Sequence, residues 1–189
     1  MTQLKYPECE AMIDIETLDT TNSSVVFQVA IVYFEPDTLN EVNKEIWTLD
    51  VDAQLAMGRT VSASTIAFHL GIPANALKCL TSKRAQHPSI FLQGLSKSLE
   101  IAKPKAIWAK GSFDFNILED MYGQCDVPVP WKYYQERELR TLMKECGVSK
   151  GDVSHNALED CYAQIIQLSS CRLKIKQLSS CDSTGVSDK

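Results

Sequence analysis

The chain has 189 residues, and its 24 acidic side chains outnumber its 19 basic ones, which gives a formal net charge of −5. Hydrophobic residues make up 44% and charged residues 23%, values typical of a globular protein, which excludes a disordered chain or a long coiled coil. The length fits one domain whose core needs no disulfide or metal to stabilise it. The acidic balance argues against a protein that coats nucleic acid through a broad basic surface.

Other sequence features bear on location. No run reaches the roughly 18 apolar residues of a membrane span, and no secretory signal opens the sequence. The seven cysteines are scattered and form no Cys-x-x-Cys pair, so they predict neither a disulfide framework nor a zinc site. We therefore expect a cytoplasmic protein in a reducing compartment, with one domain over residues 1–178 and a polar, disordered tail over residues 179–189.

The N-terminal third predicts three strands. Residues 9–18 are rich in apolar side chains, and residues 24–34 form a continuous β-branched and aromatic run that suits a buried strand. Turn-forming residues occupy 19–23, and residues 41–49 supply a third strand, so we expect an antiparallel meander.

The rest of the chain has helical spacing, interrupted by a short apolar strand. The predicted helices cover residues 62–70, 74–80, 89–102, 113–122, 135–146 and 156–168, and the strand covers residues 106–109. Strands followed by helices that alternate with a further strand indicate an α/β domain, in which helices flank a mixed central sheet.

Two carboxylates lie close together in the first predicted strand. Side chains alternate along a strand, so Asp14 and Glu16 share one face while Ile13 and Ile15 pack into the core. Neighbouring carboxylates repel each other unless a proton or cation compensates, and a divalent metal is the usual partner. Asp-x-Glu is expected about once by chance in a chain this acidic, so a solvated strand face is the alternative.

A second candidate site lies at the start of the last predicted helix. Asn156 is a good N-cap, which places His155 in the preceding loop and Asp160 just over one turn inside the helix. Both side chains can then converge at the start of the helix. The alternative is a surface histidine beside an ordinary first-turn acid.

Asp114 lies between the predicted strand 106–109 and the helix that follows. Carboxylates are common near helix N-termini because they cap the helix and interact favourably with its dipole. Asp114 is therefore either a site residue or a capping residue, and the flanking Phe113 is either a ligand contact or part of the core.

Four carboxylates and one histidine thus occur at element boundaries in a fixed order: Asp14, Glu16, Asp114, His155 and Asp160. This order resembles the DnaQ-like 3′–5′ exonucleases, the DEDDh superfamily. The matching motifs are residues 13–17, 112–118 and 155–160. Residues 63–69 and 134–141 are similar to the branch of phage-type exonucleases and exoribonuclease-like domains. The resemblance covers residues 10–168 and implies a ribonuclease H-like fold, in a protein that a phage could encode and use in the host cytoplasm.

The resemblance also implies a mechanism. Two Mg²⁺ or Mn²⁺ ions would be held by the four carboxylates of Asp14, Glu16, Asp114 and Asp160, and His155 would be the general base. Thr17, Leu18 and Phe113 would bind the terminal nucleotide, although a core position is an equal alternative for Leu18.

The expected reaction is hydrolysis from the 3′ end of single-stranded DNA, releasing nucleoside 5′-monophosphates. The same chemistry on RNA is the first alternative, because 2′-OH contacts cannot be predicted from the sequence. A catalytically silent, nuclease-like module that binds nucleic acid is an alternative of another class.

One position departs from the family. Three residues before the Phe of the second motif the family often has Asn, and this chain has Lys110. Lys110 either contacts a phosphate or is solvated, and we expect solvation. The departure affects substrate positioning and leaves the proposed metal ligands in place.

A further basic and aromatic segment follows the proline-rich stretch at residues 127–131. It contains Arg137 and Arg140 and, just before them, Trp131, Tyr133 and Tyr134. The segment either stacks bases and contacts phosphates or is a solvated helix face beside buried aromatics. We expect the second arrangement.

Overall fold

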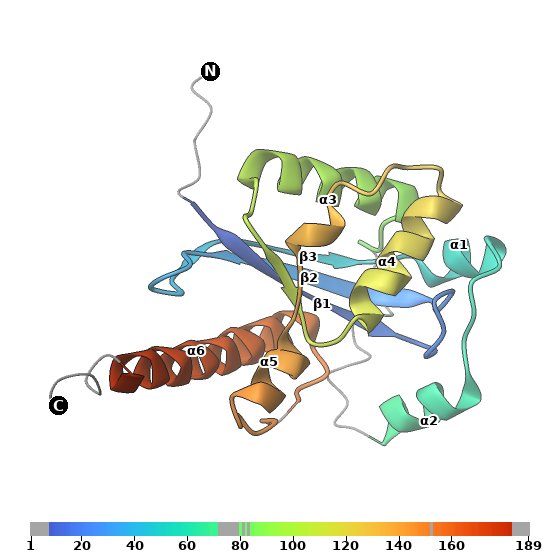
Figure 1. The fold of residues 1–189 in the computed structure, drawn as a ribbon. Coiled ribbons are helices and arrows are strands. Elements are labelled where there is room, and N and C mark those ends of the chain that lie inside the picture. The colour runs from blue at the N-terminus through green and yellow to red at the C-terminus, as the bar shows by residue number, and fades with distance from the viewer. Residues whose placement is uncertain (1–7, 72–79, 81, 83, 152, 183–189) are drawn as a thin grey trace, which may run out of the picture.

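A mixed five-stranded sheet forms the centre of the protein (Figure 1). The computed structural model describes residues 8–71, 80, 82, 84–151 and 153–182. The strands are β1 (Glu10–Thr17), β2 (Val26–Phe34), β3 (Glu41–Thr48), β4 (Ile107–Ala109) and β5 (Glu136–Glu138). Their order is β3-β2-β1-β4-β5, with antiparallel pairing from β3 to β1 and parallel pairing from β1 to β5. The predicted meander and mixed sheet are confirmed.

Helices cover both faces of this sheet. They are α1 (Val51–Ala56), α2 (Ala63–Leu70), α3 (Pro88–Ala102), α4 (Phe113–Gln124), α5 (Leu139–Glu145) and α6 (Ala157–Asp182), with a 3₁₀ turn, η2, at Tyr133–Gln135. In Figure 1, α3 and α4 lie on one side of the sheet, and α5 and α6 lie on the other. Among the described residues, no helix has both the length and the apolar character that a membrane span requires.

The alternation of β1 divides the core into two layers. Ile13 and Ile15 pack in the cluster that contains Phe91 of α3 and Phe115 of α4. Met12 points to the opposite face, where Cys161 of α6 belongs to the second cluster. Asp14 and Glu16 follow Met12 at the two-residue period of a strand, so β1 directs them to the α6 face.

Several elements differ from the sequence predictions. Helix α1 was not predicted, and residues 135–146 form the end of η2, strand β5 and helix α5 instead of one helix. The charged Glu136–Glu138 segment lacks strand periodicity, but it pairs with β4, so tertiary contact overrides local propensity. The predicted helix 74–80 lies, apart from residue 80, outside the described residues.

The C-terminal helix is longer than predicted. α6 continues to Asp182, past residue 178 where the polar tail was expected to begin. The sequence from Ala157 to Asp182 contains no glycine or proline to stop a helix, so the polar composition alone does not end it.

Candidate active site

Strand β1 and helix α6 bring the first carboxylates together. Asp14 and Glu16 are on the face of β1 that α6 covers, as the strand alternation predicted. Gln164 Nε2 of α6 donates a hydrogen bond of 2.6 Å to Asp14 Oδ1. Gln164 is itself buried, so this contact fixes the Asp14 carboxylate against the helix.

The loop before α6 folds back onto Asp160. Asn156 caps the helix, since its Oδ1 accepts hydrogen bonds from the backbone N–H groups of residues 158 and 159. His155 has a left-handed backbone with φ of 56°, which turns the chain sharply before the helix. Asp160 Oδ1 accepts from Ser154 N at 2.8 Å, and its Oδ2 accepts from His155 N at 3.0 Å. The predicted cap and the position of His155 outside the helix are both confirmed.

Asp114 joins the cluster from the opposite face of the sheet. It lies in the first turn of α4, and its Oδ1 accepts a hydrogen bond of 3.2 Å from Ile15 N of β1. β4 pairs with Ala11 and Met12 of β1 and ends at Ala109. Ile15 lies beyond the residues of β1 that pair with β4. Its N–H therefore donates to the Asp114 carboxylate instead of to a backbone carbonyl of β4.

The carboxylates are close enough to share a cation. Ligand oxygens of Asp14, Glu16 and Asp160 all lie within 4.8 Å of one another. Burial, followed by the charges of Asp160 and Asp114, raises the pKa of Glu16 to about 8. Burial also raises the pKa of Asp114 to about 7, and burial together with the neighbouring carboxylates raises the pKa of Asp14 well above its usual range. An all-oxygen donor set with this repulsion fits a divalent cation such as Mg²⁺ or Mn²⁺.

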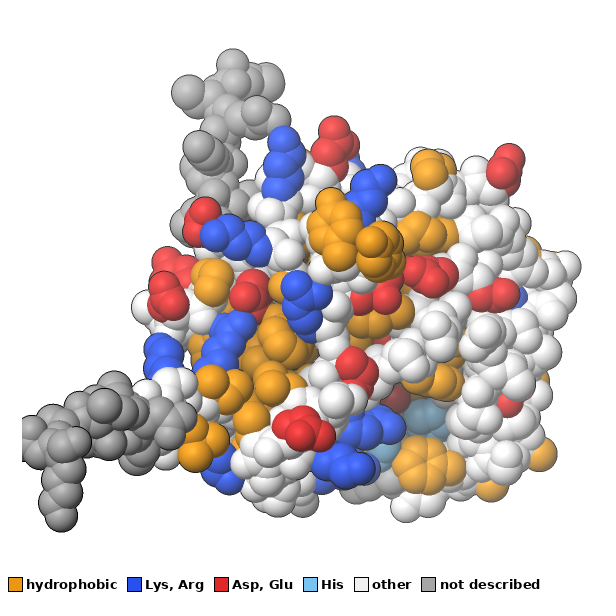
Figure 2. Space-filling model, in the orientation of Figure 1, with side chains coloured by type: hydrophobic (Ala, Val, Ile, Leu, Met, Phe, Trp, Pro, Cys, Tyr) orange, Lys and Arg blue, Asp and Glu red, His pale blue; other side chains and the backbone are white. Residues whose placement is uncertain are grey.

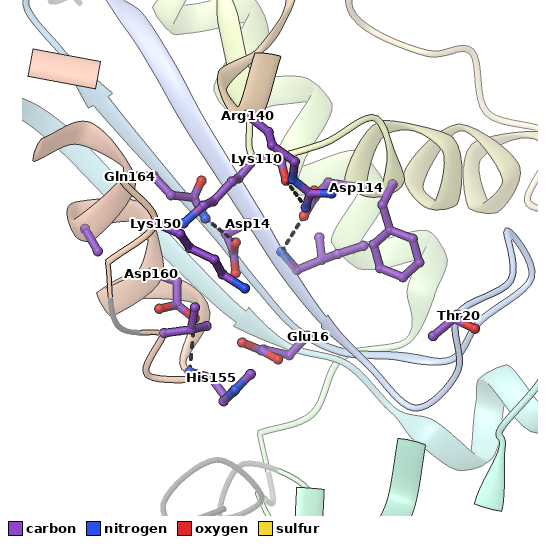
Figure 3. A pocket seen from close by; sticks show the side chains of 14 residues that line it. Asp14, Glu16, Thr20, Lys110, Asp114, Arg140, Lys150, His155, Asp160 and Gln164 are labelled. Carbon is purple, nitrogen blue, oxygen red and sulfur yellow. Dashed lines mark hydrogen bonds between the residues drawn. The ribbon is translucent and has the colours of Figure 1, made fainter. Parts of the chain in front are cut away.

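These residues line a cavity of about 430 Å³ (Figure 3). The four carboxylates and His155 share it with three basic residues: Lys110, Arg140 and Lys150. Figure 2 shows blue basic side chains gathered beside the pale-blue histidine surface. The cavity therefore combines acidic groups with a cationic wall.

The position of Lys110 corrects the sequence prediction of a solvated lysine. Its side chain lines the cavity, and burial lowers its pKa. Arg140 is exposed, as expected, but it also lines the cavity, and its Nη2 donates to the Lys110 carbonyl oxygen at 2.9 Å. No sequence pattern indicated Lys150, because it lies in a loop without a motif and reaches the cavity only through the tertiary fold.

A second cavity, of about 360 Å³, adjoins the first. Glu16, Phe113 and His155 line both cavities, so the two meet at the acidic cluster. The rest of the second cavity is formed by Ile15, Thr17, Asp19 and Thr20, and by polar and aromatic residues of α2, including Phe68. This composition suits a nucleoside better than a phosphate, because it combines aromatic surface with hydroxyl groups.

Helix α2 contributes two aromatic residues that sequence reasoning did not single out, although residues 63–69 carried part of the resemblance. Phe68 is 52% exposed, and its ring contacts the His155 ring edge-on at 5.0 Å between centroids. His69 is buried, and its Nε2 donates to the Thr17 carbonyl oxygen at 2.9 Å. α2 thus supports both the end of β1 and the side chain of His155.

The structure separates the predicted substrate-binding residues. Thr17 and Phe113 line the second cavity. Leu18 is buried in a cluster with Val25 and Phe27, and it is not among the described residues that line either cavity. The core alternative for Leu18 is therefore the one that the structure supports.

The aromatic segment before α5 is also mixed. Trp131 is buried, as expected, but Tyr133 is 85% exposed and Tyr134 is 62% exposed. The prediction of buried aromatics is wrong for the two tyrosines. They lie in the η2 turn that precedes β5, where the chain passes along the edge of the sheet.

Solved structures of E. coli exonuclease I share this fold. The complex with a dT13 oligonucleotide matches 92% of this chain and 43% of its own, with a TM-score of 0.72 and 13% identity. The complex with a dA16 oligonucleotide matches 91% and 42%, with a TM-score of 0.71 and 14% identity. This chain thus spans less than half of the exonuclease I chains. The similarity confirms the predicted DnaQ-like, ribonuclease H-like fold.

Sequence comparisons assign the family. No curated protein sequence matches the chain. A family model described as a 3′–5′ exoribonuclease Rv2179c-like domain matches residues 9–171, which include all five residues of the predicted acidic and histidine set. Because this match covers most of the sequence, the chain belongs to the family of Rv2179c-like 3′–5′ exoribonuclease domains.

Proposed function

We propose that the protein is a metal-dependent exonuclease that removes nucleoside 5′-monophosphates from the 3′ end of single-stranded nucleic acid. One observation carries the proposal: buried carboxylates from β1, α4 and α6 converge with His155 on one cavity. Desolvated carboxylates that repel one another are costly to keep without a counter-charge. Their presence together is explained by a cation that the reaction needs.

The residues divide into two ligand sets. Asp14, Glu16 and Asp160 would hold one Mg²⁺ or Mn²⁺, and Asp14 and Asp114 would engage a second. When bound, two such ions stabilise the attacking and leaving oxygens of an in-line displacement. Gln164 orients Asp14, and the backbone N–H groups of Ser154 and His155 orient Asp160.

His155 is the proposed general base. Burial lowers the pKa of its imidazole, which favours the neutral form that accepts a proton from an attacking water. The Phe68 ring limits the movement of the imidazole on one side, and the hydrogen bond from His155 N to Asp160 fixes its backbone. These contacts hold the proposed proton acceptor next to the acidic cluster.

The second cavity is the proposed site for the terminal nucleoside. It meets the acidic cluster at Glu16, and it has two exposed aromatic surfaces, Phe68 and Phe113, on which a base can stack. The 3′-terminal nucleoside of a nucleic acid fits there, because the scissile phosphate would then lie at the carboxylates.

The sugar preference has two candidates. Single-stranded DNA is the substrate expected from the sequence, and E. coli exonuclease I, which shares the fold, has been solved with dT13 and dA16 oligonucleotides. The description of the matching family as an exoribonuclease domain favours RNA instead. Matched DNA and RNA oligonucleotides degraded in parallel give the answer from the ratio of kcat/KM.

The activity test uses a 5′-labelled oligonucleotide with Mg²⁺ or Mn²⁺. The wild type should shorten it stepwise from the 3′ end, and Asp14→Asn should not. Glu159→Gln is the matched control, because Glu159 is an exposed carboxylate next to Asp160 that does not line the cavity. Full-length substrate after incubation, or equal shortening by Asp14→Asn, would contradict the proposal. Thermal stabilisation by Mg²⁺ without hydrolysis would favour the silent binding module.

A further inference from the structure

The first cavity contains three basic side chains as well as its four carboxylates. Lys110, Arg140 and Lys150 line it, and none of the three forms an ion pair with any residue that the structure describes. Two divalent cations would balance the four carboxylates, and the three basic residues would then have no acidic partner in the cavity. With metal bound, the site would therefore present three basic side chains that lack an anionic partner.

The three basic residues come from separate parts of the fold but gather in one region. Lys110 follows β4, Arg140 lies in the first turn of α5, and Lys150 lies in the loop between α5 and α6. Figure 3 shows them around Asp14, on the side of the cluster away from Thr20. None of them is among the described residues that line the second cavity.

The position of Arg140 is set by its backbone surroundings. Its Nη2 donates to the Lys110 carbonyl, and Gly111, at φ of 133°, leaves room for the guanidinium; a Cβ there would come within 3.3 Å of Nη2. The nearby Glu138 caps α5 by accepting from the backbone N–H groups of residues 140 and 141. The Arg140 guanidinium therefore keeps donors free for an external acceptor.

We propose that Lys110, Arg140 and Lys150 bind the substrate phosphate immediately 5′ of the scissile phosphate. This inference rests on the proposed function, which places the terminal nucleoside in the second cavity and the scissile phosphate at the carboxylates. The strand then leaves through the first cavity, along its cationic wall. Arginine suits two phosphate oxygens at once, and lysines add point charges, so the set recognises charge and not base identity.

The test is a chemical double-mutant cycle. A neutral methylphosphonate replaces the phosphate 5′ of the scissile one in a labelled oligonucleotide, and affinity is measured by fluorescence anisotropy with Ca²⁺ in place of Mg²⁺. Wild type should bind the neutral linkage roughly tenfold more weakly. Lys110→Met and Arg140→Met should bind the normal oligonucleotide roughly tenfold more weakly and lose little more on the neutral one.

Two controls make the cycle decisive. Lys144→Met removes an exposed charge from α5 outside the cavity, and it should keep the full methylphosphonate penalty. Arg140→Lys keeps the charge and should recover part of the affinity that Arg140→Met loses. Thermal unfolding curves check that both variants are folded. Removing one of these phosphate contacts should also reduce the magnitude of the negative slope of log affinity against log salt by about 0.7.

The inference is overturned if the methylphosphonate penalty is the same in wild type, Lys110→Met and Arg140→Met. It is also overturned if only a methylphosphonate farther 5′ shows coupling. Hydrolysis of the unmodified oligonucleotide by wild type is a separate readout. Its absence counts against the proposed function, whereas additive penalties in an active enzyme count against the phosphate site alone.

Discussion

The two faces of strand β1 come from one eight-residue segment, yet they differ in kind. One face places Ile13 and Ile15 in a continuous hydrophobic layer with α3 and α4. The other face begins with Met12 in the α6 layer and continues as Asp14 and Glu16 at the cavity. A single strand therefore stabilises the fold on one side and holds repelling charges on the other. The apolar layer keeps the charged residues in place.

The largest expected effect concerns the charged face. Asp160→Asn keeps the side-chain volume but removes a negative charge from the cluster, so we expect kcat to fall about a thousandfold or more. The thermal unfolding temperature of the metal-free variant should fall modestly, because an amide NH2 replaces one of the two oxygens that accept from Ser154 N and His155 N. Single-turnover kinetics measure the loss of catalytic rate, and calorimetric titration with Mn²⁺ measures the loss of metal affinity. Normal metal binding by the variant would remove Asp160 from the ligand set.

The apolar face should respond in the opposite way. Ile13→Ala leaves a cavity in a fully buried layer and should lower the free energy of unfolding by about 2–5 kcal/mol. The kcat of the folded fraction should stay near that of wild type. Urea unfolding measures the loss, with exposed Ile166→Ala on α6 as the control within about 0.5 kcal/mol. A large loss of kcat in stable, folded Ile13→Ala would break the division between the faces.

The second cavity provides a smaller effect. Phe68→Ala removes an exposed ring that contacts His155, so we expect KM to rise roughly tenfold through lost base stacking. Stability should be almost unchanged. Leu70→Ala is the matched control, because Leu70 is also exposed on α2 but is not among the cavity-lining residues. Equal KM values for both variants would argue that bases do not stack on Phe68.

The smallest effect is a pH dependence of the metal-free protein. The pKa of Glu16 is raised to about 8 and that of Asp114 to about 7, whereas unfolded carboxyl groups titrate near pH 4. The folded state then binds more protons than the unfolded state between about pH 4 and pH 8, so stability falls as pH rises through this window. Unfolding curves in EDTA should show the decline, and Glu16→Gln should reduce it.

Added Mg²⁺ should reverse this trend, because cation binding competes with protonation of the same carboxylates. The thermal stabilisation by Mg²⁺ should therefore be greater at pH 8 than at pH 6. A stabilisation that is independent of pH would show that these carboxylates do not hold the cation.

Much of the candidate site could be predicted from short patterns. The two-residue period of β1 puts Asp14 and Glu16 on one face. The Asn156 cap sets the start of the helix and so places His155 in the loop before it. These are local relations, determined within a few residues. The contributions of Phe68 and Lys150 could not be predicted in this way, because Phe68 meets His155 through a contact distant in sequence and Lys150 lies in a loop without a motif. The phage-type branch and the single-domain assignment stay predictions.

Local sequence patterns establish which residues alternate and where the helix with Asp160 starts, and they contain the ordered set of five chemical groups that indicates a nuclease. Contacts between distant segments bring Asp114 to β1 beyond the end of β4, bury Leu18 in the core, and place Lys110 and Arg140 at the cavity. The physical reason is the range of the interactions. Backbone periodicity and capping act over a few residues, whereas burial and charge depend on which distant segments the sheet brings together.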